Sequence, residues 1–581
     1  MFPLMKTNKM AVNLTNFSNL REIKKDLQLC ANKCMARGLI HTAKWAADLS
    51  LSIQISLPND IRHINEDPRF LTEYDSYLMG KTCFDSKEFE RAAFYLENCT
   101  SDECYFLKIY SLYLAGEKKK NNEKTDILGP LEKNTIKNKN LLQLKNELSK
   151  NQKSLDGFSF YLFGVVLKEL DLKQEALEMF EQSVGKEPLL WSSWLEIALL
   201  YSTKDKAKYI KNLPNHWMKS LFDAHVAMTQ QQNFEALQMY SELHDHCFQT
   251  SFYILSQLAL AQYNLKDFDV AVTSYEEINK IHPYCLENMD TYSNILYVKE
   301  MKPELSHLAH HCFEIDKYRV ETCCVVANFY SLRQCHEKAI LYFQRALRLN
   351  PRYLSAWTLM GHEYMEMKNT SAAIESYRQA IEVSPRDYRA WYGLGQTYEI
   401  MKMPLYSLYY FSEAQRLKPN DARMIIALGE CYQKLSRVDE AKKCYRRAIG
   451  VGDVDGIAVL QLARLYERLQ ENEDACRYYM TYTKKADIIG VLSTEDVSGA
   501  YKFLSRHFIN NKQYAEASKY AQKCCDYSET REDGKTMLRE ISELRSLAEC
   551  TSTPVNCTLS ESWQRPSTDV QISPMNLTFS P

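Results

Sequence analysis

Large apolar, small and polar residues recur along this chain with a fixed period. Trp357 and Trp391 occupy equivalent positions in two successive repeats, and each is followed four residues later by a glycine. The apolar positions around them are spaced three, four or seven residues apart, which places them on one face of an α-helix. The pattern therefore predicts pairs of antiparallel helices that repeat every ~34 residues, the offset between the two tryptophans.

Seven such units follow one another in phase. Their fourth positions are Leu255, Met289, Cys323, Trp357, Trp391, Ile425 and Val459. Small residues at the eighth, twentieth and twenty-seventh positions allow helices to approach closely, while large residues fill the space between repeats. Proline at the end of the unit stops the second helix. This is the pattern of the tetratricopeptide (TPR) repeat. We expect an all-α fold, a TPR superhelical solenoid of antiparallel helix hairpins.

The same pattern, with interruptions, divides the rest of the chain. It restarts at Tyr501, later than one period after Val459, which indicates an insertion of about eight residues. We expect a disordered N-terminus at 1–19, N-terminal helical repeats at 20–116, a Lys/Asn-rich loop at 117–153 and TPR units at 154–250. The seven in-phase units fill 251–484, the insertion and a last TPR unit follow at 485–548, and 549–581 is a disordered Ser/Pro tail.

Composition narrows the classes of function. The formal net charge of −2 argues against electrostatic binding to nucleic acid or to membranes. The N-terminal residues show no apolar signal-peptide core, and no apolar run is long enough to span a membrane. We therefore expect a protein of the nucleus and cytoplasm whose eighteen cysteines are reduced and packed as small apolar residues.

Candidate chemistry is sparse. The segment from His362 to Glu366 is one residue short of a zinc-protease pattern and lies inside a strong TPR helix, and His244 to Cys247 reads as a polar turn. Cys99 and Cys104 match no strong zinc signature. No nucleophile lies in a pattern with a base. We expect no enzyme activity, no metal and no cofactor.

The first helix of each TPR pair lines the concave face, so its polar side chains predict a binding groove. The candidate residues are Asn328, His362, Glu366, Arg389, Tyr392, Gln396, Glu399 and Glu430. Carboxylates around an aromatic ring suit an extended peptide that carries an arginine, because the guanidinium can bond a carboxylate through two hydrogen bonds. The alternative is that these are solvated surface charges.

Beyond the repeat, the chain resembles the cell division cycle protein 23 family, subunit 8 of the anaphase-promoting complex. The residues that carry the resemblance are dense over 320–460 and again over 500–535. They include the runs Asn350-Pro351-Arg352-Tyr353, Gly361-His362-Glu363-Tyr364-Met365-Glu366, Arg389-Ala390-Trp391-Tyr392-Gly393-Leu394-Gly395 and Ser573-Pro574-Met575-Asn576-Leu577. Many of them lie outside the general TPR positions.

The resemblance implies a non-catalytic scaffold subunit of a multisubunit ubiquitin ligase that controls mitotic progression. Family members form homodimers through their N-terminal repeats, dock against the other TPR subunits and accept the arginine-containing C-box peptide of a coactivator. The alternative is a TPR adaptor of another multiprotein assembly. Co-fractionation with a megadalton ubiquitin ligase separates the two.

The tail predicts phosphorylation. Thr553, Ser573 and Ser580 each precede a proline, as proline-directed cell-cycle kinases require. Phosphate groups there would add negative charge to a flexible segment. We expect mass spectrometry of mitotic material to find phosphate on these residues. Finding all three unmodified would contradict the prediction.

Overall fold

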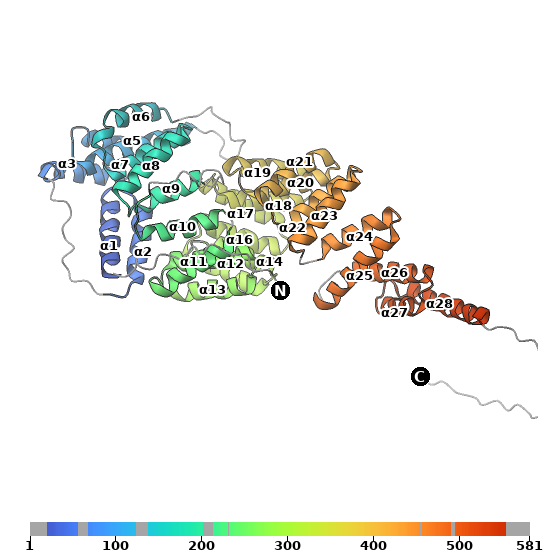
Figure 1. Ribbon diagram of the computed structural model, residues 1–581. Helices are drawn as coiled ribbons and strands as arrows, with labels where there is room; N and C mark the ends of the chain where they lie inside the picture. Colours follow the sequence, from blue (N-terminus) through green and yellow to red (C-terminus); the bar gives the residue numbers. More distant parts are fainter. Residues whose placement is uncertain are drawn as a thin grey trace, which may run out of the picture. The chain divides into compact units, whose positions relative to one another are not determined.

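The computed structural model describes residues 20–55, 68–123, 138–201, 213–230, 232–453, 456–489 and 494–552. Its described residues form α-helices and connecting turns, and none of them lies in a β-strand. The all-α fold is therefore confirmed (Figure 1). Two compact units divide the chain, 1–397 and 398–581, with the boundary inside helix α20.

Unit 1 consists of successive helix pairs. Its helices are α1 (Leu20–Ala36), α2 (Ile40–Ser52), α3 (Pro68–Asp85), α4 (Phe89–Tyr95), α5 (Asp102–Glu123), α6 (Leu141–Lys150), α7 (Gly157–Glu169), α8 (Lys173–Lys186), α9 (Trp191–Tyr201), α10 (Met218–Thr229), α11 (Asn233–His246), α12 (Phe252–Leu265), α13 (Phe268–Ile281), α14 (Met289–Val298), α15 (Lys302–Ile315), α16 (Val320–Leu332), α17 (His336–Leu349), α18 (Leu354–Glu366), α19 (Thr370–Val383) and α20 (Tyr388–Ile400). A short 3₁₀ turn at Gln152–Ser154 precedes α7.

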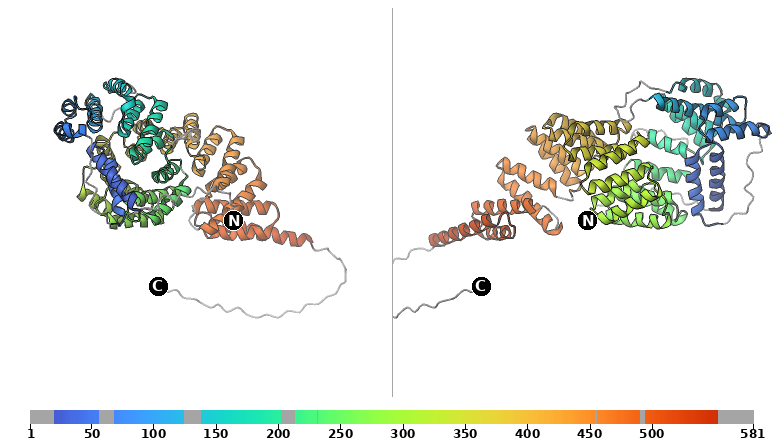
Figure 2. Two further views of the ribbon diagram at one scale, coloured as in Figure 1. Left: turned by 60° about the vertical axis from the view of Figure 1, so that its left-hand side comes forward. Right: turned by 180° about the vertical axis from the view of Figure 1, so that it is seen from behind.

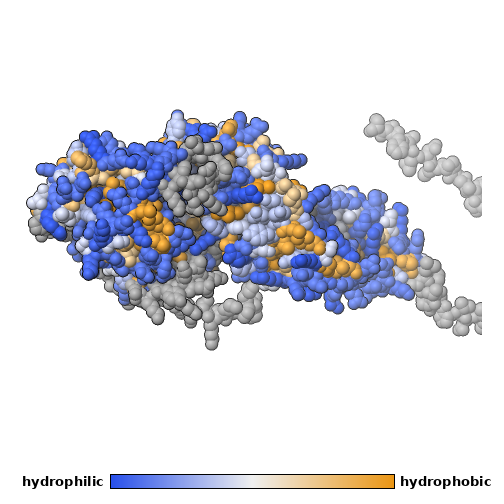
Figure 3. Space-filling model, turned by 90° about the horizontal axis from the view of Figure 1, so that it is seen from above, coloured by the Kyte–Doolittle hydropathy of each residue, from blue (hydrophilic) through white to orange (hydrophobic). Residues whose placement is uncertain are grey.

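Unit 2 continues the pairs. Its helices are α21 (Pro404–Leu417), α22 (Ala422–Lys434), α23 (Val438–Gly452), α24 (Ile457–Arg468), α25 (Asn472–Ile489), α26 (Thr494–Asn510), α27 (Tyr514–Cys525) and α28 (Arg531–Ser552). Seen from above, the surface is mainly hydrophilic with separate apolar patches (Figure 3).

The period of the sequence recurs in the backbone. A residue with positive φ ends the first helix of each pair, at Lys266, Glu300, Gln334, Lys368, Lys402, Ser436 and Gln470, and each comes one full period after the one before. A left-handed residue is a common way to end an α-helix and turn the chain back. The next one, Lys512, comes later than one further period would place it, which fits the expected insertion. Helix α25, with 18 residues, is longer than the 14-residue second helices α17 and α19.

A side-chain hydrogen bond repeats between one helix pair and the next. The indole Nε1–H of Trp194, Trp357 and Trp391 donates to the carbonyl of Pro188, Pro351 and Pro385 at 2.8, 2.8 and 3.0 Å. Each proline follows the second helix of a pair, and each tryptophan lies in the first helix of the next pair. The bond gives each indole N–H an acceptor and links the turn between repeats to the next helix.

Small residues set the distance between paired helices. A Cβ atom added to Gly361 on α18 would lie 2.5 Å from the ring of Tyr377 on α19. The equivalent pairs Gly164/Phe180 and Gly429/Tyr445 show the same close approach, at 2.5 and 2.6 Å. The rings are fully buried, so the small–large complementarity expected from the sequence forms the core of the helix pairs.

The hairpin of α1 and α2, the N-terminal hairpin, does not simply stack on its sequence neighbours. Helix α2 packs against α12 and contacts α9 through Trp45 and Thr42, so that the curving repeats of unit 1 come back to the hairpin (Figure 2). Cys30 Sγ donates to the Leu189 carbonyl at 3.3 Å, and Asp48 accepts from Ser251 Oγ at 2.7 Å. The hairpin therefore joins segments that are 159 and 203 residues away in the chain.

One boundary expected from the sequence was wrong. The range 117–153 is not a loop throughout, because α5 runs to Glu123 and α6 occupies Leu141–Lys150. The apolar residues Leu141, Leu144 and Leu148 are buried at helical spacing, which explains why α6 forms. Residues 1–19 and the tail residues Thr553, Ser573 and Ser580 lie outside the described residues.

Two further expectations can be compared with the described residues. None of their helices combines the length and apolar content needed to cross a membrane. Their cysteines form no disulfide, and most of them, Cys323 and Cys524 included, are buried.

Alanine substitutions at Gly361 and Gly185 should change the free energy of unfolding in opposite directions, because only Gly361 lies against a buried ring. We expect Gly361→Ala to lower the free energy of unfolding by about 1–3 kcal/mol, because the added methyl overlaps a buried ring. Gly185→Ala on α8 is the matched control, since its added methyl meets no atom within 4 Å. That change should stabilise by up to about 1 kcal/mol. Urea unfolding followed by circular dichroism measures both, and equal effects would contradict the packing argument.

Candidate functional site

The groove residues predicted from the sequence all lie on the first helices of their pairs. In unit 1, Asn328 lies on α16, His362 and Glu366 on α18, and Arg389, Tyr392 and Gln396 on α20. In unit 2, Glu399 is the next-to-last residue of α20 and Glu430 lies on α22. The two sets are described separately.

Asn328 belongs to the interior of unit 1. Its side chain is buried, and Nδ2 donates to Ser293 Oγ and to Asn294 Oδ1, both at 2.8 Å. The amide thus links α16 to α14. This explains why a polar residue is stable at a buried position.

His362 and Arg389 form a connected part of the same face. His362 Nδ1 is 2.7 Å from the Tyr377 hydroxyl. Burial and the nearby Arg389 charge lower the pKa of His362 to about 4, so the imidazole is neutral at physiological pH. The Arg389 guanidinium lies over the ring of Tyr263 on α12, 5.9 Å from its centroid. A permanent positive charge therefore sits inside unit 1 beside a neutral histidine.

The remaining candidate groove residues of unit 1 differ in solvent exposure. Glu366 and Gln396 are exposed, whereas Tyr392 is half-buried. Of this set, Glu366 supplies an exposed carboxylate and Gln396 an exposed amide.

In unit 2 the structure brings two carboxylates together. Glu399 pairs with Lys434 Nζ at 2.5 Å, and Glu430 accepts from Gln461 Nε2 at 3.2 Å. Burial and the neighbouring Glu399 charge raise the pKa of Glu430. We refer to Glu399 and Glu430 as the acid pair. Their mutual repulsion favours a cationic ligand at this point.

Sequence reasoning missed two residues at the acid pair and one near His362. Lys434 follows Glu430 by four residues, so helical spacing could have placed it on the same face. Gln461 comes from α24, the next first helix. Glu363 is buried and accepts from Ser331 Oγ at 2.6 Å, and its other oxygen lies 2.9 Å from His336 Nδ1. It links α16, α17 and α18.

One group of possible metal ligands forms among the described residues, on Glu73, Cys99 and Cys104, whose ligand atoms lie within 4.8 Å of one another. The Glu73 carboxylate already accepts from the backbone N–H of Thr100 at 2.8 Å and of Ser101 at 3.0 Å, at the start of α5. This explains its position as a helix cap.

Helix pairs that repeat with the TPR period, with polar side chains on the first helices, define a TPR solenoid of the kind that binds other protein chains. The family model described as "Anaphase promoting complex subunit 8 / Cdc23" matches residues 22–259, and three TPR models match 253–283, 361–401 and 422–451. None of these four models describes a catalytic family.

The relatives are consistent with this match. The chain is 51% identical over 306 residues to "Cell division cycle protein 23 homolog" of Bos taurus, covering 52% of this chain and 51% of the relative. It is 38% identical over 412 residues to "Anaphase-promoting complex subunit 8" of Dictyostelium discoideum, covering 61% of this chain and 70% of the relative. The chain belongs to the anaphase-promoting complex subunit 8/Cdc23 family. It spans about half the length of the mammalian relatives that it matches.

A solved structure shares the fold. A chain in the crystal structure of the APC/C hetero-tetramer Cut9-Hcn1 superposes with a TM-score of 0.56 at 13% identity, covering 91% of this chain and 98% of that chain.

Proposed function

We propose that the protein acts as a non-catalytic TPR scaffold subunit of the anaphase-promoting complex ubiquitin ligase, in the nucleus and cytoplasm. Its membership of the subunit 8/Cdc23 family carries the proposal. The stacked helix pairs offer extended surfaces for docking against other TPR subunits, as solenoids do.

The acid pair is where this subunit would take the arginine of the coactivator C-box peptide. Glu399 lies in the last turn of α20 and Glu430 on the next first helix, α22, and the raised pKa of Glu430 reports a carboxylate that is partly desolvated and close to a like charge. A guanidinium placed there would relieve the repulsion and form bidentate hydrogen bonds. Lys434 already neutralises part of this charge. The unit 1 residues Asn328, His362, Glu366, Arg389, Tyr392 and Gln396 stay a prediction for the rest of the groove.

Binding of a C-box peptide tests this assignment. We expect wild-type protein to bind the peptide and to lose at least about tenfold in affinity when the peptide arginine is replaced or when Glu430→Lys is introduced, since a charge-assisted hydrogen bond contributes about 1.5–3 kcal/mol. Lys434→Met should strengthen binding because it removes a competing cation. Fluorescence anisotropy gives the affinities.

The matched control is Glu440→Lys, an exposed acid on the second helix α23 of the same pair. It should leave binding unchanged. Arginine-independent binding, or equal losses in Glu430→Lys and Glu440→Lys, would refute the acid pair as the site while leaving the subunit proposal standing.

We also propose that the N-terminal repeats form a homodimer. On α3, Leu71, Tyr74 and Leu78 are 65%, 47% and 50% exposed. Their spacing of three and four residues forms an apolar stripe, and a second apolar face of the same helix is buried. A helix that is apolar on its exposed face favours contact with another protein surface. A second copy would cover the stripe through a two-fold interface.

Light scattering during size-exclusion chromatography tests the homodimer. We expect a dimer for the wild type and a monomer for the double variant Leu71→Lys/Leu78→Lys, because charges would have to be buried at the interface. Leu142→Lys on α6, at a position 66% exposed, is the control and should remain dimeric. A monomeric wild type, or a dimeric double variant, would contradict the proposal.

A further inference from the structure

Unit 1 encloses a cavity that shares no residue with the predicted groove. It lies between the N-terminal hairpin and the repeats against which the hairpin packs, and we refer to it as the hairpin pocket. Helix α2 forms one wall, α9 and α12 form a second, and the segment Ile281–Asn288 together with Arg319 forms the third. Its volume is about 790 Å³, within the roughly 300–1,000 Å³ of ligand-binding pockets.

The walls of the hairpin pocket are held by contacts between distant parts of the chain. The Asp48 carboxylate on α2 accepts from Ser251 Oγ at 2.7 Å, and from the backbone N–H of Phe252 at 3.3 Å and of Tyr253 at 3.2 Å. It therefore caps the N-terminus of α12. Thr42 on α2 is hydrogen-bonded to Ser192 on α9. Such a pocket is formed before a ligand arrives, which lowers the entropic cost of binding.

Aromatic rings make one side of the pocket apolar. Trp45 on α2 stacks on Trp191 on α9, with 4.9 Å between ring centroids and 6° between planes. Tyr253 on α12 meets both rings edge to face, at 5.9 and 6.1 Å. This wall suits an apolar side chain.

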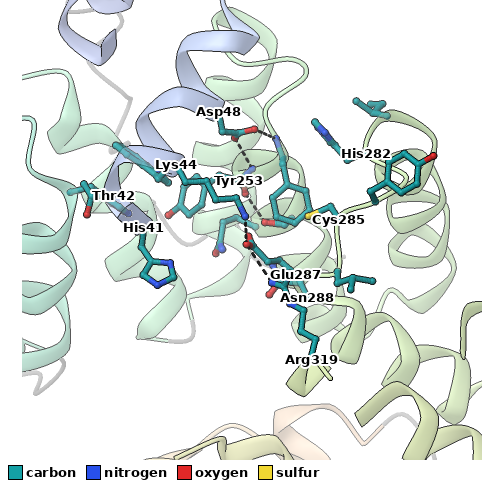
Figure 4. A pocket seen from close by; sticks show the side chains of 18 of the residues that line it. His41, Thr42, Lys44, Asp48, Tyr253, His282, Cys285, Glu287, Asn288 and Arg319 are labelled. Atoms are coloured by element: carbon teal, nitrogen blue, oxygen red, sulfur yellow. Dashed lines mark hydrogen bonds and ion pairs between the residues drawn. The ribbon is translucent and has the colours of Figure 1, made fainter. Parts of the chain in front are cut away.

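Charged side chains also line the pocket. Lys44 pairs with Glu287, and Glu287 also forms an ion pair with Arg319 at 3.6 Å (Figure 4). Within the protein, Asp48 takes three hydrogen bonds and Glu287 pairs with two cations, while Arg319 also donates its Nε–H to Glu321 at 2.9 Å. The donors are in surplus, because an ammonium has three N–H groups and a guanidinium five. The Lys44 side chain is 61% exposed.

The excess of hydrogen-bond donors over acceptors indicates which kind of ligand fits the pocket. A ligand that supplies hydrogen-bond acceptors, namely a carboxylate and backbone carbonyls, would accept hydrogen bonds from the remaining N–H groups of Lys44 and Arg319. The amides of Gln257 and Asn288 also line the pocket and can hold a peptide backbone. A doubly charged phosphate fits less well, because the carboxylates of Asp48 and Glu287 lie in the same walls.

We propose that the hairpin pocket binds an extended peptide segment of a partner protein, which inserts an apolar side chain against Trp45 and Trp191 and directs a neighbouring carboxylate toward Lys44 and Arg319. The assignment does not rest on the proposed function, since it uses other residues and an acidic rather than a basic peptide. Every wall of this second peptide site comes from unit 1 of one copy of the chain.

Selection from a random peptide library displayed on phage, against the full chain, tests the proposal. We expect the selected peptides to share an apolar residue next to Asp or Glu. Synthetic copies should bind Lys44→Met and Arg319→Gln at least about tenfold more weakly than wild type, because each variant loses a charge-assisted contact. Lys25→Met, an exposed lysine on α1 outside the pocket, is the matched control and should bind as wild type.

Several results would overturn the proposal. The selection would contradict it if no peptides were enriched or if the enriched peptides were basic. The binding measurements would contradict it if all three variants bound the selected peptides equally well, or if Glu430→Lys abolished their binding. Circular dichroism confirms that each variant is folded. Light scattering covers the remaining alternative: a dimer that dissociates on Lys44→Met would show that a second copy occupies the pocket, and the partner-peptide proposal would then be wrong.

Discussion

One aromatic ring sets the spacing of the repeats on which the rest of the structure depends. Tyr377 on α19 lies so close to Gly361 on α18 that a methyl group there would sit 2.5 Å from the ring, and a methyl group added to Gly393 on α20 would lie 2.6 Å from the same ring. The ring therefore closes the contact within its own helix pair and the contact with the next pair. Because interiors pack as densely as organic crystals, a larger residue at either glycine would push the helices apart.

This packing decides which side chains remain available for binding. The first helices use one face for the neighbouring repeat and present another to the groove, and residues near the border between faces become structural. Asn328 and Glu363 are both buried with two hydrogen-bond contacts each, and they link neighbouring helices. Glu399 and Glu430 keep a charge imbalance that a basic ligand can relieve. The first helices thus supply the contacts that hold the solenoid together and also carry the charged residues of the predicted groove.

The N-terminal hairpin is held by polar contacts with distant parts of the chain rather than by the packing of neighbouring repeats. Arg37, next to its turn, is buried and pairs with Glu103 at 3.1 Å and with Asp156 at 3.3 Å, while its guanidinium lies 4.3 Å from the centroid of the Phe158 ring. Removing one partner of such a buried pair leaves an uncompensated charge, which costs about 3–5 kcal/mol. These bonds fix the hairpin at α5 and α7, and the Asp48 cap fixes its other end at α12. The hairpin pocket exists because both ends are held.

The sequence by itself determined the fold class, the repeat period, the position of the insertion after α24 and the family. These follow from local rules: helical spacing of apolar residues, small residues where helices touch, and proline after a helix. It also placed the candidate groove residues on the first helices of their pairs. Only the tertiary structure decided that Asn328 is buried, that Lys434 neutralises Glu399 and that α2 packs on α9 and α12. Those outcomes depend on contacts between residues up to about two hundred positions apart, as between Asp48 and Ser251, and no periodic pattern in one sequence records such contacts.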